Sequence, residues 1–400
     1  MRRIPVHVHP GGRFLRVVIL AAASLGFAVL LALSSSCGSD PPQAPRTPTL
    51  EDTIDELVRP CLDFGSPSGL IIGLTRHGER TVLRYANAEL GYEVPRRDGL
   101  FEITSLTKTF TATLLAQLIQ DNLVRLDDPV DAYLSEDVEM PTCEGEPIRI
   151  RHLVTHTAGL PMLPPGSVEG SYTEQQVLDC LENLASGSTT FCEPTADGGH
   201  VPLGVRMRHS EVGYAVLGMV IERITGRPLG ELLRERVCDP LGLGDTRDYG
   251  QLDDDQRTRL INAYEVDGTE LDFWRTTRLD GACGLAASID DLLQYLEACM
   301  APDGPLGDVL SMTQEPLFWN YGLPGDSTGI GMAWSIFRSA GRQVYGQRGW
   351  RNMTCVAYFW PERKTALVLI STTRQHWPIG DALAAEIWAE IEELETVSAP

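Results

Sequence analysis

Strand-forming segments lie at both ends of this 400-residue chain, and most residues between them have a helical pattern. Near the N-terminus, the apolar runs 69–75 and 81–86 are joined by His77-Gly78, which is typical of a β-hairpin. Four more strand-like segments follow late in the chain, at 332–338, 343–347, 354–360 and 365–372. Strands at both ends around a helical middle predict one antiparallel sheet built from both termini, with a helical lobe inserted.

The helical lobe is expected at about 106–300. Residues 105–123 show this most clearly, because Phe110, Leu114 and Leu118 recur at the spacing of one helix face. The other predicted helices are 50–57, 173–184, 213–224, 229–237, 288–299 and 380–394. Since 43% of the residues are hydrophobic, the chain can bury a sizeable core. We therefore expect one folded domain of the α/β (α+β) class over 51–400.

The first 36 residues predict an export signal rather than part of the fold. Four arginines and no acidic residue precede or flank the uncharged run 17–33. Small residues then lead to Cys37, which is similar to the lipidated cysteine of bacterial lipoproteins, although Ser34 replaces the usual aliphatic residue. Residues 37–50 are rich in proline and small polar residues and predict a flexible tether. We expect a lipid-anchored protein of the cell envelope, facing the periplasm or exterior and not the cytoplasm; a retained membrane anchor or plain cleavage are the alternatives.

Charge and cysteine content narrow the possible partners. The net charge of −22 makes nucleic-acid binding improbable, because an acidic surface repels phosphate. Eight cysteines remain after Cys37, and an even number in an exported protein favours disulfides. The pairs Cys180–Cys192 and Cys283–Cys299 are suggested by their short loops, with buried free thiols as the alternative. No Cys-x-x-Cys occurs, and the acidic run 253–255 is interpreted as a solvated loop, so no metal is expected.

Ser105 and Lys108 form a Ser-x-x-Lys sequence at the start of a predicted helix. Residues three apart share a helix face, so the hydroxyl and the amine can meet. A serine hydroxyl becomes a good nucleophile only when a base takes its proton, and lysine can serve if its pKa is lowered. Arginine cannot serve, yet the chain has 31 arginines and only two lysines. The pattern favours a catalytic pair over an ordinary capped helix with a surface lysine.

The surrounding sequence resembles the serine β-lactamase family, most closely its class C branch, which is shared with D-Ala-D-Ala carboxypeptidases and carboxylesterases. The resemblance spans roughly 50–400 and rests on the segments 101–112, 126–130, 148–161, 213–218, 239–243, 284–285 and 290–292. It implies the β-lactamase/transpeptidase-like fold, a nucleophilic serine at the boundary of the lobes, an acyl-enzyme and no metal or organic cofactor. It also implies that His156 in this series is structural.

The second family motif, usually Tyr-x-Asn, is replaced here by His209, Ser210 and Glu211. The usual pKa of histidine, about 6.5, is closer to working pH than the roughly 10 of tyrosine. A carboxylate, unlike an amide, cannot donate to a substrate carbonyl, and beside Lys108 it would favour the ammonium form. We therefore expect His209 to act as general base and then acid, Glu211 to orient or charge its neighbours, and Lys108 to stay cationic. The alternative is a decayed site.

The third family motif, usually a cation followed by a variable residue and glycine, is replaced by Gln347, Arg348 and Gly349. Gly349 would let substrate approach the backbone. The resemblance implies an oxyanion hole made by the backbone N–H groups of Ser105 and Trp350. Arg348 should point to the opposite face of its strand from Gln347, and Arg351 could compensate for the lost cation.

These features predict an exported serine hydrolase that acts through a Ser105 acyl-enzyme. Loss of the cation that would attract a substrate carboxylate favours a neutral ester or amide, so we rank esterase-like hydrolysis before peptidase or amidase activity, and β-lactamase activity last. The expected partners are a small-molecule or cell-wall-derived substrate and the membrane that holds Cys37. The alternative is a non-catalytic family member that binds an envelope ligand or partner.

Overall fold

The fold is described from a computed structural model. The residues that it describes are 48–63, 69–135, 138–167, 172–187, 191–195, 199–273, 280–321, 326–339, 341–374 and 377–397. The predicted export signal, Cys37 and the tether up to residue 47 lie outside these residues.

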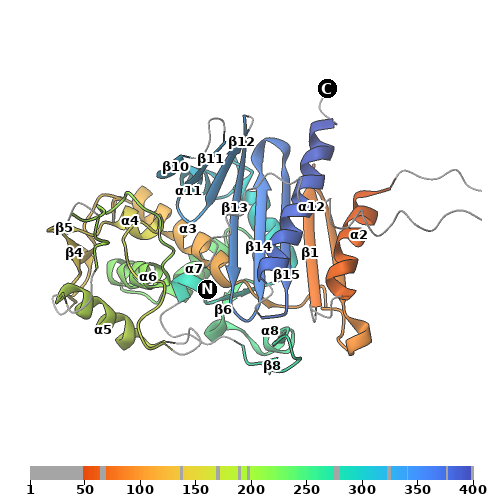
Figure 1. Ribbon diagram of the computed structural model, residues 1–400, viewed down its shortest axis with the longest axis horizontal. Coiled ribbons are helices and arrows are strands. Elements are labelled where there is room, and N and C mark those ends of the chain that lie inside the picture. Colours follow the sequence, from red (N-terminus) through yellow and green to blue (C-terminus); the bar gives the residue numbers. More distant parts are fainter. Residues whose placement is uncertain are drawn as a thin grey trace, which may run out of the picture. The chain divides into compact units, whose positions relative to one another are not determined.

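The main sheet joins the two ends of the chain, as the sequence predicts (Figure 1). Its eight strands run in the order β10-β11-β12-β13-β14-β15-β1-β2, and each neighbouring pair is antiparallel. The N-terminal hairpin lies beside the last strand, so that Leu70 pairs with Ser371. The strands that were predicted are β1 (Gly69–Arg76), β2 (Glu79–Ala86), β12 (Ser335–Ser339), β13 (Arg342–Trp350), β14 (Thr354–Trp360) and β15 (Thr365–Ser371).

The edge strand β10 and its neighbour β11 were not predicted. β10 (Phe318–Tyr321) and β11 (Asp326–Ile330) extend the sheet beyond β12. The sequence of β11 is Asp-Ser-Thr-Gly-Ile, in which only the last residue is apolar, so it lacks the alternation that marks a half-buried strand. The β12 strand also begins later than expected, because Ala333 takes a positive φ of 70° that interrupts extended backbone.

The sheet is covered by helices on both faces (Figure 1). The terminal helices α2 (Leu50–Asp63) and α12 (Trp377–Val397) contact each other, and α12 packs on β14 and β15. Leu70, Ile72 and Leu74 of β1 belong to this core, whereas Ile71 faces the larger core shared with the helical lobe. Successive side chains of β1 therefore point alternately into the two cores, one on each face of the sheet.

The helical lobe holds the remaining long helices. The predicted helices are present as α3 (Thr107–Gln120), α5 (Glu174–Ala185), α6 (Glu211–Thr225) and α10 (Ile289–Cys299). The segment predicted as one helix over 229–237 is α7 (Leu229–Leu233) followed by a π-helical turn, Arg234–Cys238. The shorter elements are α4 (Ile150–Val154), α8 (Asp254–Thr258), α9 (Asp280–Cys283), α11 (Gly307–Gln314) and a sheet of β3 (Phe101–Glu102), β9 (Leu285–Ala287) and β6 (Arg247–Asp248). None of the described helices is long and apolar enough to cross a membrane.

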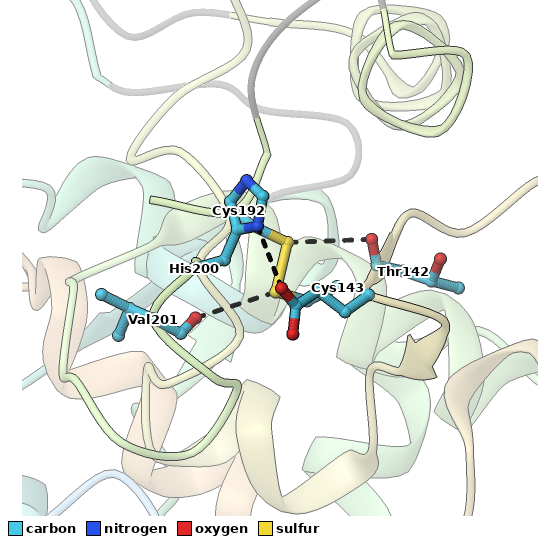
Figure 2. Close-up of a disulfide and its surroundings, with 6 residues drawn as sticks. Thr142, Cys143, Cys192, His200 and Val201 are labelled. Carbon is cyan, nitrogen blue, oxygen red and sulfur yellow. Dashed lines mark hydrogen bonds and ion pairs between the residues drawn. A yellow bond between two sulfur atoms is a disulfide. The ribbon is translucent and has the colours of Figure 1, made fainter. Parts of the chain in front are cut away.

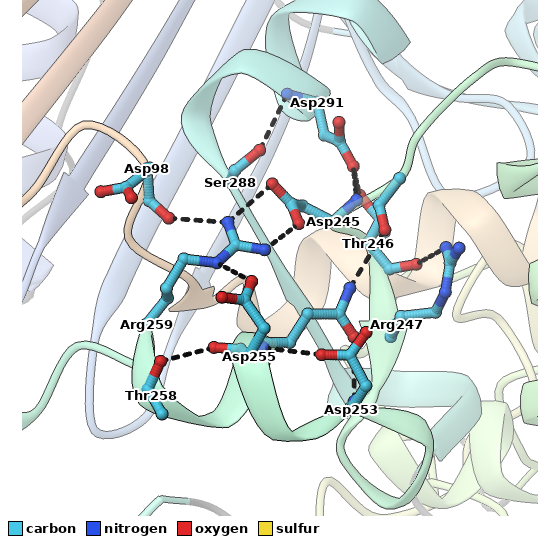
Figure 3. A network of polar contacts seen from close by, with 12 residues as sticks. Asp98, Asp245, Thr246, Arg247, Asp253, Asp255, Thr258, Arg259, Ser288 and Asp291 are labelled. Atoms are coloured by element: carbon cyan, nitrogen blue, oxygen red, sulfur yellow. Dashed lines mark hydrogen bonds and ion pairs between the residues drawn. The ribbon is translucent and has the colours of Figure 1, made fainter.

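The acidic run 253–255 is solvent-exposed, as expected, but it caps and begins the helix α8 rather than forming a loop (Figure 3). Asp253 caps α8 by accepting a 2.8 Å hydrogen bond from the Gln256 backbone N–H. Asp255 accepts a 3.0 Å hydrogen bond from Arg259, which also binds both carboxylate oxygens of Asp245. Within the described residues, no cluster of acidic, histidine and cysteine side chains could hold a metal ion.

Both predicted disulfide pairings are wrong. Cys192 pairs with Cys143, at a Cα–Cα distance of 5.6 Å, and Figure 2 shows this bridge beside His200. Cys180 is a buried free thiol, as are Cys283 and Cys299. Loop length misled the sequence argument, because α5 ends before the segment that carries Cys192 and separates it from Cys180. Most of the described free cysteines are buried, which agrees with the alternative interpretation.

Candidate active site

The candidate nucleophile, Ser105, lies in a 3₁₀ turn (Thr104–Leu106) directly before α3. Thr104 has a positive φ of 49°, which is unusual for a β-branched residue and often marks a functional turn. Ser105 is only 5% exposed. The turn packs under β13 and β14 of the main sheet, so the hydroxyl lies where the sheet meets the helical lobe.

Gly349 on β13 presses against this turn. A Cβ atom at position 349 would lie 2.1 Å from Thr104 Oγ1 and 2.4 Å from the Ser105 backbone nitrogen. The sequence suggests that the absent side chain leaves room for substrate. The structure instead shows that the turn carrying Ser105 fills this space, so glycine is needed for the close approach of two backbone segments.

Lys108 lies in the first turn of α3 with its side chain fully buried. Its Nζ donates a 2.9 Å hydrogen bond to Ser105 Oγ and a 3.1 Å hydrogen bond to the Ala282 carbonyl. Burial lowers the pKa of Lys108, whereas the nearby Glu211 carboxylate raises it and Arg351 lowers it. The net effect is a lowered pKa, because the cost of desolvating the ammonium outweighs the attraction of Glu211. The expectation that Lys108 stays cationic remains a prediction.

Glu211 is the first residue of α6 and forms an ion pair with Arg351, which directly follows β13. The two side chains are 4% and 8% exposed, so the pair is buried. The sequence suggests Arg351 only as a substitute for the cation missing at position 347. The sequence does not reveal that Arg351 pairs with Glu211. The one signal for this pair is that an acidic and a basic residue occur at or near the two altered motifs.

His209 lies beside His156, with ring centroids 4.5 Å apart. His156 is buried, and its Nδ1 accepts a 3.1 Å hydrogen bond from the Ser210 backbone N–H, a structural contact. His209 as a residue is exposed, yet burial of its ring and the positive charges of Lys108 and Arg351 lower its pKa. Among the described residues, Lys108 rather than His209 is hydrogen bonded to Ser105.

Gln347 and Arg348 point to opposite faces of β13, as strand alternation predicts. The Gln347 side chain is buried, donates a 2.8 Å hydrogen bond to the Ala333 carbonyl and accepts one of 2.9 Å from the Arg348 backbone N–H. The Arg348 guanidinium instead pairs with Asp381 on α12. Trp350, the last residue of β13, is 45% exposed and offers an apolar surface next to Gly349.

Tyr172 is a buried neighbour that is missing from the candidates found by sequence. Its hydroxyl is among the described buried polar atoms that have no hydrogen-bond partner. Burial raises the pKa of this hydroxyl, and the charge of Glu211 raises it further, which places Tyr172 close to the Glu211–Arg351 pair. No sequence motif marks this residue.

Comparisons with known proteins identify the family of the chain. The Beta-lactamase family profile matches residues 54–390. The D-alanyl-D-alanine-carboxypeptidase/endopeptidase AmpH of Escherichia coli (strain K12) is 24% identical over 282 residues, covering 70% of this chain and 70% of its own. The esterase EstB of Burkholderia gladioli is 28% identical over 282 residues, covering 61% of this chain and 68% of its own.

Solved structures share the fold. A class C β-lactamase superposes with a TM-score of 0.70 at 18% identity, covering 85% of this chain and 98% of its own. The β-lactamase/D-alanine carboxypeptidase from Pseudomonas syringae gives a TM-score of 0.69 at 21% identity, covering 88% of this chain and 99% of its own. The predicted β-lactamase/transpeptidase-like fold is confirmed, and the chain belongs to the β-lactamase family of serine hydrolases.

Proposed function

We propose that this protein is an exported serine hydrolase that cleaves an ester or amide through a Ser105 acyl-enzyme. The observation that carries the proposal is the 2.9 Å hydrogen bond from buried Lys108 Nζ to Ser105 Oγ. Lysine becomes a competent base when burial lowers its pKa, and here burial is the largest influence on that pKa.

The proposed reaction has two steps. Ser105 Oγ attacks the substrate carbonyl while the neutral Lys108 amine takes the hydroxyl proton, and the backbone N–H groups of Ser105 and Trp350 stabilise the oxyanion. The bond to the leaving group then breaks, the leaving alcohol or amine takes up a proton, and the acyl group stays on Ser105. A water molecule, giving up its proton to the site, attacks the ester and releases the acid and the free serine.

His209 is proposed to carry protons at the outer side of the site. Its lowered pKa keeps the imidazole neutral near pH 7, so that it can accept a proton from the water molecule that replaces the leaving group. This differs from the role expected from sequence, because the hydrogen bond to Ser105 comes from Lys108. Glu211 is proposed to act on Lys108 through its negative charge.

Two observations support a neutral ester over a carboxylate-bearing substrate. Gln347 has no charge, and its amide is held by the Ala333 carbonyl. The positive charge of Arg351 is offset by Glu211, and Arg348 faces α12. A substrate carboxylate would therefore meet no unopposed cation at this motif. The esterase EstB of Burkholderia gladioli is similar over 61% of the chain, which agrees with this preference.

Turnover of three substrate classes tests the proposal. We expect hydrolysis of a p-nitrophenyl ester of a short acid at a higher kcat/KM than a penicillin or a D-Ala-D-Ala peptide, and loss of all three activities in Ser105→Ala. Faster turnover of the penicillin or the peptide would overturn the ester preference. No turnover of any class by folded protein would favour the second candidate, a non-catalytic envelope protein, which the replacements His209, Glu211 and Gln347 support.

The envelope location is part of the proposal. The basic start, the uncharged run 17–33 and Cys37 support export and lipid anchoring. The Cys143–Cys192 bridge fits an oxidising compartment. Metabolic labelling with a fatty-acid probe should mark the wild-type protein but not a Cys37→Ser variant, and equal labelling of both would contradict the anchor.

A further inference from the structure

We propose that Arg351 is a positioning residue: by pairing with Glu211 it keeps that carboxylate from holding Lys108 in the ammonium form. The inference rests on the proposed function, in which Ser105 needs a neutral Lys108. It adds a role that the Ser-x-x-Lys sequence does not contain, since Glu211 belongs to the altered second motif and Arg351 lies two residues after the altered third motif.

The geometry of the ion pair is the first support. Glu211 begins α6 in the helical lobe, and Arg351 follows β13 of the main sheet, so the pair joins both sides of the site. Their side chains are 4% and 8% exposed. A buried charge that loses its partner interacts strongly with whatever other charge lies near it, because little solvent screens it. For each member of this pair, that other charge is Lys108.

The surroundings of Lys108 give the second support. Its Nζ is held by Ser105 Oγ and the Ala282 carbonyl, and lies 5.6 Å from the Tyr214 ring centroid. The titratable and charged groups around the amine are Glu211, Cys283, Arg351, His156, His209 and Tyr214. Burial favours a neutral Cys283 thiol, Tyr214 hydroxyl and His156 ring. Glu211 and Arg351 therefore supply the opposing charges that act on Lys108.

These two charges determine the direction in which each variant should change the pKa of Lys108. Arg351 lowers the pKa of Lys108 and Glu211 raises it. Removing Arg351 leaves Glu211 unopposed, which favours the ammonium form and withdraws the base from Ser105 at neutral pH. Removing Glu211 leaves Arg351 unopposed, which favours the neutral amine. Removing both charges restores the balance.

Direct titration of the amine tests this inference without any substrate. The chain contains two lysines, Lys108 and the exposed Lys364, so a protein labelled with ¹³C at the lysine ε-carbon gives two signals, assigned with Lys364→Arg. We expect Arg351→Met to raise the pKa of Lys108 by roughly one unit or more, and Glu211→Gln to lower it. The double variant Glu211→Gln/Arg351→Met should return close to wild type, and Arg351→Lys should retain the wild-type titration because it retains the charge.

Arg348→Met is the matched control. Arg348 lies on the same strand segment but pairs with Asp381 on the other face of the sheet, so its loss should leave the Lys108 titration unchanged. An Arg351→Met protein that does not fold leaves the test to Glu211→Gln, whose expected shift has the opposite sign. Equal titration of Lys108 in wild type and Glu211→Gln, or an equal shift in Arg348→Met, would overturn the inference.

The rate of Ser105 modification by a fluorophosphonate connects the titration to chemistry. The rate should fall at low pH as Lys108 becomes protonated, and we expect this fall to begin at a higher pH in Arg351→Met. At any pH on the falling, acidic side of the profile, the rate should be about tenfold lower for each pH unit by which the profile shifts. A wild-type protein that is not modified, but whose Lys108 titration shifts as expected in the variants, would sink the proposed function and leave the charge pairing intact. A wild-type protein that is modified, with a Lys108 titration that does not shift in the variants, would leave the proposed function intact and overturn the charge pairing.

Discussion

At the scale of single residues, Gly349 allows β13 to approach the turn that carries Ser105 closely. We expect Gly349→Ala to slow fluorophosphonate modification of Ser105 at least tenfold, because the new Cβ would meet Thr104 Oγ1 at 2.1 Å and push the turn away. Gly244→Ala is the control, since nothing lies within 4 Å of its added Cβ. Equal rates in both variants would show that the Ser105 turn accommodates the extra atom.

His209 provides a second test at this scale. We expect His209→Phe to reduce steady-state ester turnover by about 10²-fold, because it removes a proton carrier. Acylation, measured as the pre-steady-state burst, should be affected less, since Lys108 holds the hydrogen bond to Ser105. His200→Phe, which replaces an exposed histidine paired with Glu144, should behave like wild type. Near-normal steady-state turnover in His209→Phe would remove His209 from the mechanism.

The site was predictable from sequence where its contacts are local. Ser105 and Lys108 meet because residues three apart share one helix face, and this needs no tertiary information. The Glu211–Arg351 pair joins α6 to the end of β13, and only the fold brings those residues together. The lowering of the Lys108 pKa by burial was not predictable for the same reason, because complete burial cannot be read from the sequence around it.

At the scale of elements, the Cys143–Cys192 bridge ties the segment that leads towards His209 back to β4 (Thr142–Cys143) (Figure 2). The bridge closes a sequence separation of 49 residues. Loop-closure entropy predicts a loss of about 4 kcal/mol in the free energy of unfolding when both cysteines are replaced by alanine. Urea unfolding measures this loss, with the unbridged, half-buried Cys61→Ser as control. A loss no larger than that of the control would contradict the bridge.

Arg259 links three segments of the chain (Figure 3). It donates to Asp245, to Asp255 and to the Asp98 carbonyl, and it is 14% exposed. We expect Arg259→Met to lower the free energy of unfolding by about 1–2 kcal/mol at pH 7, allowing for solvent screening of the partly exposed Asp245. The exposed pair Arg96–Asp98 gives a control, Arg96→Met, which should change stability little.

The stabilising effect of Arg259 should depend on pH. Its hydrogen bond lowers the pKa of Asp245 below the ordinary 3.8. A carboxyl group whose pKa is lowered by folding stabilises the protein above its unfolded pKa and loses that effect as pH falls through the folded pKa. The difference between wild type and Arg259→Met, followed by thermal unfolding, should therefore shrink below about pH 4. A difference that stays constant down to pH 2 would contradict a charge-based link.

At the scale of the whole molecule, the sheet was predictable because apolar runs mark buried strands wherever they occur. The β1–β2 hairpin and the strands β13 to β15 carry this signal, and the helices α2 and α12 cover the face that their alternation leaves apolar. The strands β10 and β11 were missed, since β10 has only four residues and β11 has a single apolar residue at its end.

The fold holds Ser105, in the turn before α3, against the buried amine of Lys108, which we propose activates it. Intact-protein mass spectrometry of the full chain after incubation with a fluorophosphonate tests it most directly, beside Ser105→Ala and Lys108→Met. We predict a single phosphonyl adduct on the wild-type protein, none on Ser105→Ala and strongly slowed labelling of Lys108→Met. A folded wild-type protein without an adduct, or an adduct that persists in Ser105→Ala, would contradict the assignment of Ser105 as an activated nucleophile.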